Sequence, residues 1–384
     1  MHTLKKFLPS ALVCLGVLAL PDDSHALRLG AFEVNPFLAL TERYTDNVFN
    51  TSSDLKSDFS TVITPGVQVI FPRVKKHYHG EIIFQADMER FNKYTSQNAD
   101  DFKTLGTFDV KFPGGLEFGV KDEFIRNHDP QGVNPGIDLN FFRTNLALAS
   151  VAYNLFERFK VKLEYSNYLV HYDADRNDFE NRTDNTLATY VFYALTPKTS
   201  AFVEYDFVNV DFKTSDELDS KEHHFYGGVA WDITGKTKGT VKGGYEVKNF
   251  RGPAVEGFKG FITELIVDHN FTVRQSVKIK GMRRTNETNT PGTDFYTTTG
   301  GSVEYFQRFT GKITGTANIS YGVDVYHGGL PRRDNTWQGG GGLLYQFRKW
   351  LRTEVKYVYT KRNSSENEFN YRNNTFYFKV VASL

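Results

Sequence analysis

The stretch 58–71 reads DFSTVITPGVQVIF, and apolar and polar side chains alternate along it. Phe59, Ile63 and Val67 fall on one face, and Ser60 and Thr64 fall on the other. A period of two predicts a β-strand with one apolar and one polar face. Strands in globular proteins usually have about five or six residues. A strand of this length is instead typical of a tilted bilayer crossing, with its apolar face toward lipid.

The same alternation recurs to the end of the chain, for example over 159–165, 201–207 and 313–325. Short connections are expected near 72, 113, 154, 197, 234, 270, 308 and 348, with a longer, turn-rich polar loop between successive ones. Nine long loops and eight short turns predict about eighteen strands, with sixteen as the alternative count.

Composition narrows the fold class. The chain has 34 Phe and 21 Tyr, a mean hydropathy of -0.44 and no apolar run long enough for a membrane helix. A β-sandwich has shorter strands, and a propeller blade holds four short strands in each repeat. We therefore predict an all-β, transmembrane antiparallel meander β-barrel with short periplasmic turns and long extracellular loops. Aromatic residues near both ends of the strands are typical of interfacial girdles.

Both ends of the chain support this interpretation. Residues 1–26 have the charge, short apolar core and small residues of a secretory signal peptide, with cleavage expected after Ala26. Residues 27–35 are expected to form a short periplasmic segment, and 36–384 the barrel. Cys14 is the only cysteine, so the mature chain lacks thiols, as in a bacterial envelope protein. We expect it in the bacterial outer membrane, in contact with lipid and lipopolysaccharide.

The last residues, from Phe376 to Leu384, alternate to the end of the chain. They predict a final strand that pairs with the first strand and closes the barrel. This segment is similar to the C-terminal assembly signal of outer-membrane barrels, although Leu384 stands where an aromatic residue is usual. The resemblance implies the barrel-assembly machinery as a partner. The net charge of +1 gives no reason to expect nucleic acid.

Histidines are the side chains to test first as metal ligands. His77, His79 and Glu81 lie on one face of a strand start, where a solvated barrel rim is the favoured interpretation. His223 and His224 point to opposite faces and cannot chelate within one strand. We expect no metal and no cofactor.

Two Ser–His pairs, Ser166 with His171 and Ser220 with His223, suggest a lipid-modifying hydrolase as a remote alternative. Nothing in the sequence marks an oxyanion site. We therefore expect no catalytic residue and no enzyme.

The polar face of the strands carries dense charge, which must face water because each Lys or Arg near the lipid midplane costs about 2–4 kcal/mol. Ion pairs that fill the lumen are one interpretation, and a hydrated channel is the other. From residue 278 onward seven predicted lining residues are basic and one is acidic, which would favour anionic solutes. The predicted pore-lining residues are Lys103, Asp109, Lys111, Glu117, Lys121, Lys160, Lys162, Glu164, Glu204, Asp206, Lys242, Glu246, Lys278, Lys280, Arg284, Lys312, Arg352, Glu354, Lys356 and Lys379.

The start of the predicted barrel resembles the β-barrel porin 2 family. The matching positions are Arg43-Tyr44, Asp46-Asn47, Ser57-Asp58 and Pro65-Gly66. The resemblance implies an outer-membrane barrel associated with exopolysaccharide or exosortase gene clusters, and periplasmic polysaccharide-export components as partners. The predicted function is a porin-like channel for exopolysaccharide or another hydrophilic solute. A structural or adhesive surface barrel with an occluded lumen is the alternative.

Overall fold

A computed structural model describes residues 26–384 except 73, 75–76, 130–138, 233–234 and 289. Almost all of the predicted signal peptide lies outside the described residues. Nineteen strands follow one another along the chain. Their bounds are β1 Leu27–Leu29, β2 Phe32–Thr45, β3 Asp58–Phe71, β4 Tyr78–Phe91, β5 Ala99–Lys111, β6 Leu116–His128, β7 Phe141–Phe156, β8 Phe159–Tyr172, β9 Arg182–Thr196, β10 Thr199–Phe212, β11 Ser220–Asp232, β12 Thr237–Phe250, β13 Phe258–Thr272, β14 Gln275–Glu287, β15 Phe295–Arg308, β16 Ile313–His327, β17 Arg333–Arg348, β18 Leu351–Ser364 and β19 Tyr371–Ser383.

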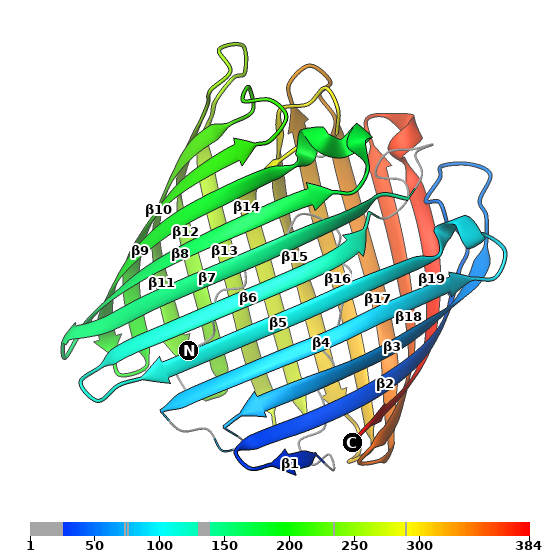
Figure 1. Cartoon of the computed structure of the whole chain (residues 1–384), viewed down its shortest axis with the longest axis horizontal. Helices are drawn as coiled ribbons and strands as arrows, with labels where there is room; N and C mark the ends of the chain where they lie inside the picture. The colour runs from blue at the N-terminus through cyan, green and yellow to red at the C-terminus, as the bar shows by residue number, and fades with distance from the viewer. Residues whose placement is uncertain (1–25, 73, 75–76, 130–138, 233–234, 289) are drawn as a thin grey trace.

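The long strands form a closed barrel (Figure 1). Each strand from β2 to β19 pairs antiparallel with its neighbours in sequence, and β19 pairs with β2 from Thr375↔Thr45 to Ser383↔Phe37. The short β1 only extends β2 as a hairpin, so the barrel itself has eighteen strands. The predicted antiparallel barrel, its strand count and its closure by the C-terminal strand are confirmed.

The connections alternate as predicted, with long loops at one end of the barrel and turns at the other (Figure 1). Three short 3-10 helices lie in the long loops: η1 Thr95–Gln97, η2 Asp175–Glu180 and η3 Asn367–Phe369. The described part of the chain contains no helix with the length and apolarity needed to cross a membrane. β1 and the first residues of β2 occupy the segment 27–35 that was expected to precede the barrel.

The strand β3 shows how the faces are used. Phe59 and Ile63 are exposed on the outer surface, whereas Ser60 and Thr64 are buried on the inner face. Ser60 Oγ donates a hydrogen bond of 2.5 Å to the Glu89 carboxylate, and Thr64 Oγ1 donates one of 2.5 Å to the Asp87 carboxylate. The inner face therefore carries polar side chains bonded between strands, and the outer face presents apolar side chains to lipid.

The inner face is tightly packed along β9–β12. Ala188, Tyr190 and Phe202 form a small apolar cluster there, against which Phe192 and Ala230 pack. Charged side chains beside this cluster are also buried. One side of the barrel is therefore filled by its own side chains.

The outer face yields a direct test. Val203 on β10 is 61% exposed on the outer face, and its two neighbours in the strand, Phe202 and Glu204, are buried on the inner face. We expect Val203→Arg to reduce the free energy of unfolding in lipid vesicles by about 2–4 kcal/mol, because the guanidinium would enter hydrocarbon. Denaturant titration followed by tryptophan fluorescence measures the change.

Ser320→Arg is the matched control, since Ser320 lies half-buried on the inner face of β16. It should change the free energy of unfolding much less. Equal losses from both substitutions would contradict the assignment of the two faces.

Candidate functional site

The inner face of the barrel is the candidate site, and its packed side is built on buried ion pairs. Lys242 Nζ on β12 lies 2.8 Å from Glu204 on β10 and 3.9 Å from Glu264 on β13. Lys248, which is fully buried, lies 2.8 Å from Glu222 on β11 and also pairs with Glu287 on β14. Such charges are stable away from bulk water only because they are paired and hydrogen-bonded.

A second feature is an inward-folded hairpin made by the loop-side ends of β14 and β15, residues 284–298 apart from 289, which lies outside the described residues. Four consecutive residues of β15 are buried: Phe295 is 4% exposed, Tyr296 0%, Thr297 5% and Thr298 7%. Successive side chains of a strand point to opposite faces, so burial of all four means that both faces are covered. A wall strand with its outer face in lipid would expose every second residue.

The contacts of the hairpin show what covers its outer face. Phe295 packs with ring centroids 5.6 Å from Phe250 and 5.8 Å from Phe258, both on the inner wall, and stacks on His327 at 4.5 Å. The Thr285 hydroxyl donates a hydrogen bond to Glu246 on β12. The hairpin therefore lies inside the barrel, against the inner wall formed by β12 and β13.

The ladder between β13 and β14 ends where the hairpin leaves the wall. Its last pair toward the long loops is Thr263↔Arg283, although β13 begins at Phe258 and β14 continues to Glu287. Arg283 Nε donates a hydrogen bond of 3.1 Å to the Phe261 carbonyl oxygen. This bond gives a partner to a β13 carbonyl group that lies beyond the end of the ladder.

Glycines lie at the bend. Gly281 pairs with Gly301 across β14 and β15, and Gly300 pairs with Gly322 across β15 and β16. A Cβ on Gly300 or on Gly301 would lie 2.9 Å from a carbonyl oxygen of the neighbouring strand. Strand glycines permit such close approach, so these residues allow the sheet to turn inward.

The opposite side of the inner face is more open. Arg352, Glu354 and Lys356 are successive inner positions of β18, and Lys379 on β19 lies directly opposite Glu354. All four are half-buried. In the described residues, Lys356 and Lys379 make no ion pair within 4.0 Å. Solvent therefore reaches a basic group of side chains on the inside of the barrel.

The predicted lining residues fall into these two environments. Many form ion pairs on the inner face: Lys103 with Glu123 at 3.2 Å, Lys160 with Glu117 at 2.8 Å, Lys111 with Glu117 at 3.5 Å, Lys121 with Glu123 at 2.6 Å, Lys162 with Glu164 at 2.6 Å and Lys278 with Asp268 at 3.5 Å. Arg284 is on the hairpin, Lys280 is half-buried on β14, and Asp109 is exposed near the end of β5. Lys312 lies in the turn before β16 rather than on a strand.

Sequence reasoning overlooked several inner charges. Asp268, Glu304, Asp324 and Asp334 lie on or beside the wall that was expected to be mainly basic. The packed side carries further charges outside the predicted set: Arg182, Asp184, Glu222, His224, Lys248 and Glu287. The available signal was alternation within a strand, because Ser220, Glu222 and His224 occupy every second position of β11.

The other sequence candidates are not assembled into sites. Ser166 is buried on the inner face, whereas His171 is exposed on the outer face. Ser220 is likewise buried inside, and His223 on the outer face accepts or donates a hydrogen bond with the Tyr205 hydroxyl at 2.8 Å. Within the described residues, His77, His79 and Glu81 do not form a three-ligand group.

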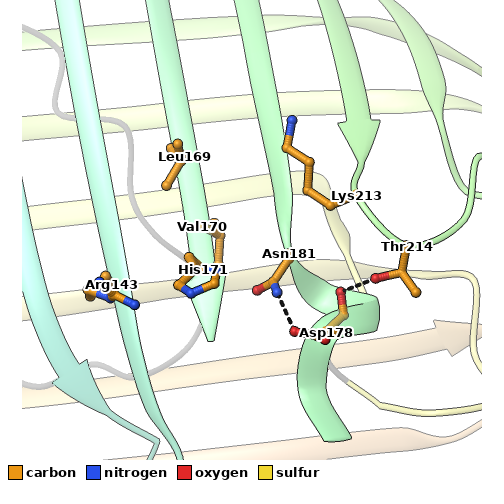
Figure 2. Close-up of a pocket in the computed structure, with 8 residues that line it drawn as sticks. All are labelled: Arg143, Leu169, Val170, His171, Asp178, Asn181, Lys213 and Thr214. Atoms are coloured by element: carbon orange, nitrogen blue, oxygen red, sulfur yellow. Dashed lines mark hydrogen bonds between the residues drawn. The ribbon is translucent and has the colours of Figure 1, made fainter. Parts of the chain in front are cut away.

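The barrel rim carries a separate surface pocket of about 530 Å³ (Figure 2). Arg143 and His171 line it from the strands, Asp178 and Asn181 from the η2 region, and Lys213 from the next loop. Asn181 Nδ2 donates to the Asp178 carboxylate at 2.7 Å, and Thr214 Oγ1 donates to the Asp178 carbonyl oxygen at 2.8 Å. The bond from Thr214 joins two neighbouring long loops.

Beside this pocket, two acidic loop residues lie near Tyr172, with Glu180 buried and Asp129 half-buried. Burial raises the pKa of Glu180 to about 8, and the neighbouring Asp129 carboxylate acts in the same direction. Burial also raises the pKa of Asp129, to about 6. Glu180 is therefore largely protonated near neutral pH, which limits repulsion between the two carboxyl groups.

The hairpin can be tested by amide hydrogen exchange. Phe295→Ala should remove its aromatic contacts at a cost of about 3–5 kcal/mol, as for other buried Phe→Ala changes. We expect faster exchange across 284–298, while amides near the short turns keep their rates. Phe261→Ala is the control because Phe261 faces outward and is 57% exposed. Unchanged exchange in the hairpin of Phe295→Ala would contradict its docking.

Comparison with solved structures finds similar barrels. OccK3 (OpdO) of Pseudomonas aeruginosa has 10% identity and a TM-score of 0.47, with 91% of this chain and 95% of that chain covered. OccAB4 of Acinetobacter baumannii has 12% identity and a TM-score of 0.47, with 91% and 98% covered. A BenF-like porin of Pseudomonas fluorescens Pf-5 has 9% identity and a TM-score of 0.48, with 91% and 99% covered.

None of the curated protein sequences matches this chain. A family model does match, described as "Putative beta-barrel porin 2", and it spans residues 21–384. The match covers almost the whole sequence and includes every strand of the barrel. The family and the barrel fold together indicate the bacterial outer membrane. The chain belongs to the beta-barrel porin 2 family of outer-membrane barrels.

Proposed function

We propose that this porin-like barrel is a channel for a hydrophilic, preferentially anionic solute, with exopolysaccharide as the favoured solute class. The observation that carries the proposal is the half-buried basic group Arg352, Lys356 and Lys379 on the inner face. Charged side chains that keep solvent contact inside a closed barrel require water in the lumen. Barrels of sixteen to eighteen strands are wide enough for such a space.

Side chains fill one side of the lumen and leave the other side more open, and this difference defines where a solute would pass. The inward-folded hairpin and the ion pairs of β9–β12 fill one side of the lumen. A solute would therefore follow the other side, past the basic residues of β18 and β19. Positive side chains in a low-dielectric enclosure raise the local concentration of anions.

Exopolysaccharide is favoured by the family resemblance and is compatible with the inner aromatic residues Tyr168, Phe202, Tyr296 and Tyr377. Aromatic rings and polar groups together are common in sugar-binding sites. Phe202 and Tyr296, however, are buried, so they would contact a polymer only after a change in packing. The chemistry of the accessible lining supports a hydrophilic solute more directly than it supports a sugar.

The proposal includes cleavage after Ala26, which would leave β1 at the mature N-terminus. Its proposed partners are lipid and lipopolysaccharide around the barrel, the barrel-assembly machinery, and periplasmic polysaccharide-export components. The occluded structural or adhesive barrel is kept as an alternative because the hairpin narrows the lumen near the long loops.

Ion selectivity tests the channel. In planar bilayers, we expect the wild-type protein to conduct with a preference for anions. Lys356→Glu combined with Lys379→Glu reverses two positive charges on the inner face, so the anion-to-cation permeability ratio should fall several-fold and favour cations. The reversal potential in a salt gradient measures this ratio.

Lys361→Glu is the control, since Lys361 lies on the same strand with its side chain exposed on the outer face. It should leave the ratio unchanged. A wild-type barrel that never conducts would favour the occluded alternative, and an unchanged ratio in the double variant would exclude these residues from the ion path.

The polysaccharide assignment needs a cellular test. We expect deletion of the gene to reduce surface and secreted exopolysaccharide and to cause its accumulation in the periplasm. Complementation with the wild-type gene should restore export. Normal export from the deletion strain, together with conductance of the purified protein, would limit the function to general diffusion.

A further inference from the structure

We propose that His224, Glu222 and Glu246 form a binding site for a divalent transition-metal ion, with Zn²⁺ as the best-fitting ion. Glu222 and His224 occupy alternate positions of β11, and Glu246 on β12 lies directly opposite His224. In the described part of the chain, these three residues are the group whose potential ligand atoms all lie within 4.8 Å of one another.

The distances fit a tetrahedral ion. His224 Nε2 lies 3.1 Å from Glu222 Oε2 and 3.8 Å from Glu246 Oε1. Zinc bonds to nitrogen and carboxylate oxygen are about 2.0–2.2 Å long, so ligand atoms around a tetrahedral zinc are separated by about 3.4 Å. Three protein ligands leave the fourth position for water.

A second observation comes from the other side of the imidazole. Asp206 Oδ2 on β10 lies 3.8 Å from His224 Nδ1, and the Asp206 side chain is 12% exposed. Its second oxygen, Oδ1, has no hydrogen-bond partner within the described residues. A carboxylate beside the other ring nitrogen is the usual support for a metal-binding histidine, because a hydrogen bond between them fixes the tautomer that directs Nε2 at the ion. At 3.8 Å, Asp206 and Nδ1 would have to approach by about 1 Å to form that bond.

The charge balance also favours a cation. Four carboxylates, Asp206, Glu222, Glu246 and Glu287, meet three basic groups here: Lys248, His224 and, next to Glu287, Arg182. Lys248 Nζ lies 2.8 Å from Glu222 Oε1. The Lys248 ammonium therefore binds Oε1 of Glu222, which is not a proposed ligand atom. Oε2 of Glu222, the proposed ligand atom, remains directed toward His224.

Nε2 must be unprotonated to bind the ion, so any proton on His224 Nε2 would pass to solvent on binding. His224 keeps 16% of its side chain exposed, so an ion can reach it from the lumen. Glu246 also accepts the hydrogen bond from Thr285. The site thus lies where the inward-folded hairpin meets the wall.

Metal titration of the purified barrel tests the proposal. After treatment with a chelator and removal of the chelator, the full-length mature protein in detergent should bind one Zn²⁺ per chain in calorimetry near neutral pH. Co²⁺ at the same site should give the intense visible absorption of a tetrahedral complex. Absence of stoichiometric binding, or only the weak absorption of octahedral Co²⁺, would overturn the proposal.

Adjacent histidines supply matched variants. His224→Asn should weaken Zn²⁺ binding at least about 100-fold and abolish the Co²⁺ spectrum, since it removes the nitrogen ligand. His223→Asn should preserve both, because that side chain faces outward. Glu246→Gln should also lose tetrahedral Co²⁺, and Asp206→Asn, which alters a positioning residue, should weaken binding about 10–100-fold.

Folding of each variant is checked by heat-dependent mobility in gels, which reports a closed barrel. Retention of stoichiometric, tetrahedral binding by folded His224→Asn or by folded Glu246→Gln would reject the assigned ligands. Equal loss in folded His223→Asn would reject the site as well. Conductance is not used as the readout, so the result stands apart from the proposed channel function.

Discussion

The whole structure depends on one constraint: every backbone N–H and C=O group within the membrane must be hydrogen-bonded by the protein itself, because hydrocarbon forms no hydrogen bonds. Hydrocarbon cannot satisfy the N–H and C=O groups of an open sheet edge, so a membrane-spanning sheet must close. Pairing of β19 with β2 meets that requirement with the last strand of the chain. Closure then creates an inner surface shielded from lipid, and this is why the polar residues of every strand can be charged.

The same constraint explains the limits of the inward-folded hairpin. β13 and β14 separate only beyond Thr263↔Arg283, toward the long loops, and Arg283 supplies a hydrogen bond to the Phe261 carbonyl oxygen. Toward the turn side the ladder between these strands continues to Thr272↔Gln275, with one shift of register after Asn270. The residues of the inward-folded hairpin no longer pair with β13. They make aromatic contacts around Phe295 and polar contacts with Glu246 and Lys248 instead.

Because the hairpin covers only one side of the lumen, charged residues on the two sides have different environments. Under the hairpin, charged residues are excluded from bulk water and must pair with one another, as Lys248 does with Glu222 and Glu287. Away from it, Lys356 and Lys379 can remain hydrated. A buried cluster with more carboxylates than cations stores unfavourable electrostatic energy, and a bound divalent ion at His224 would relieve it. The metal-site inference and the channel proposal thus arise from different parts of one inner surface.

Alternation along the chain was sufficient to predict the barrel, its eighteen strands, its closure and the faces of residues such as Phe59 and Ser60, because side-chain direction in a strand is local. The sequence also showed that dense charge lies on the polar face. Only the tertiary structure decided which of those charges meet. The docking of Phe295 and the cluster around His224 depend on contacts between strands that are not neighbours in sequence, such as those of β14 and β15 with β12. A period of two assigns each residue a face but not its neighbours across the lumen.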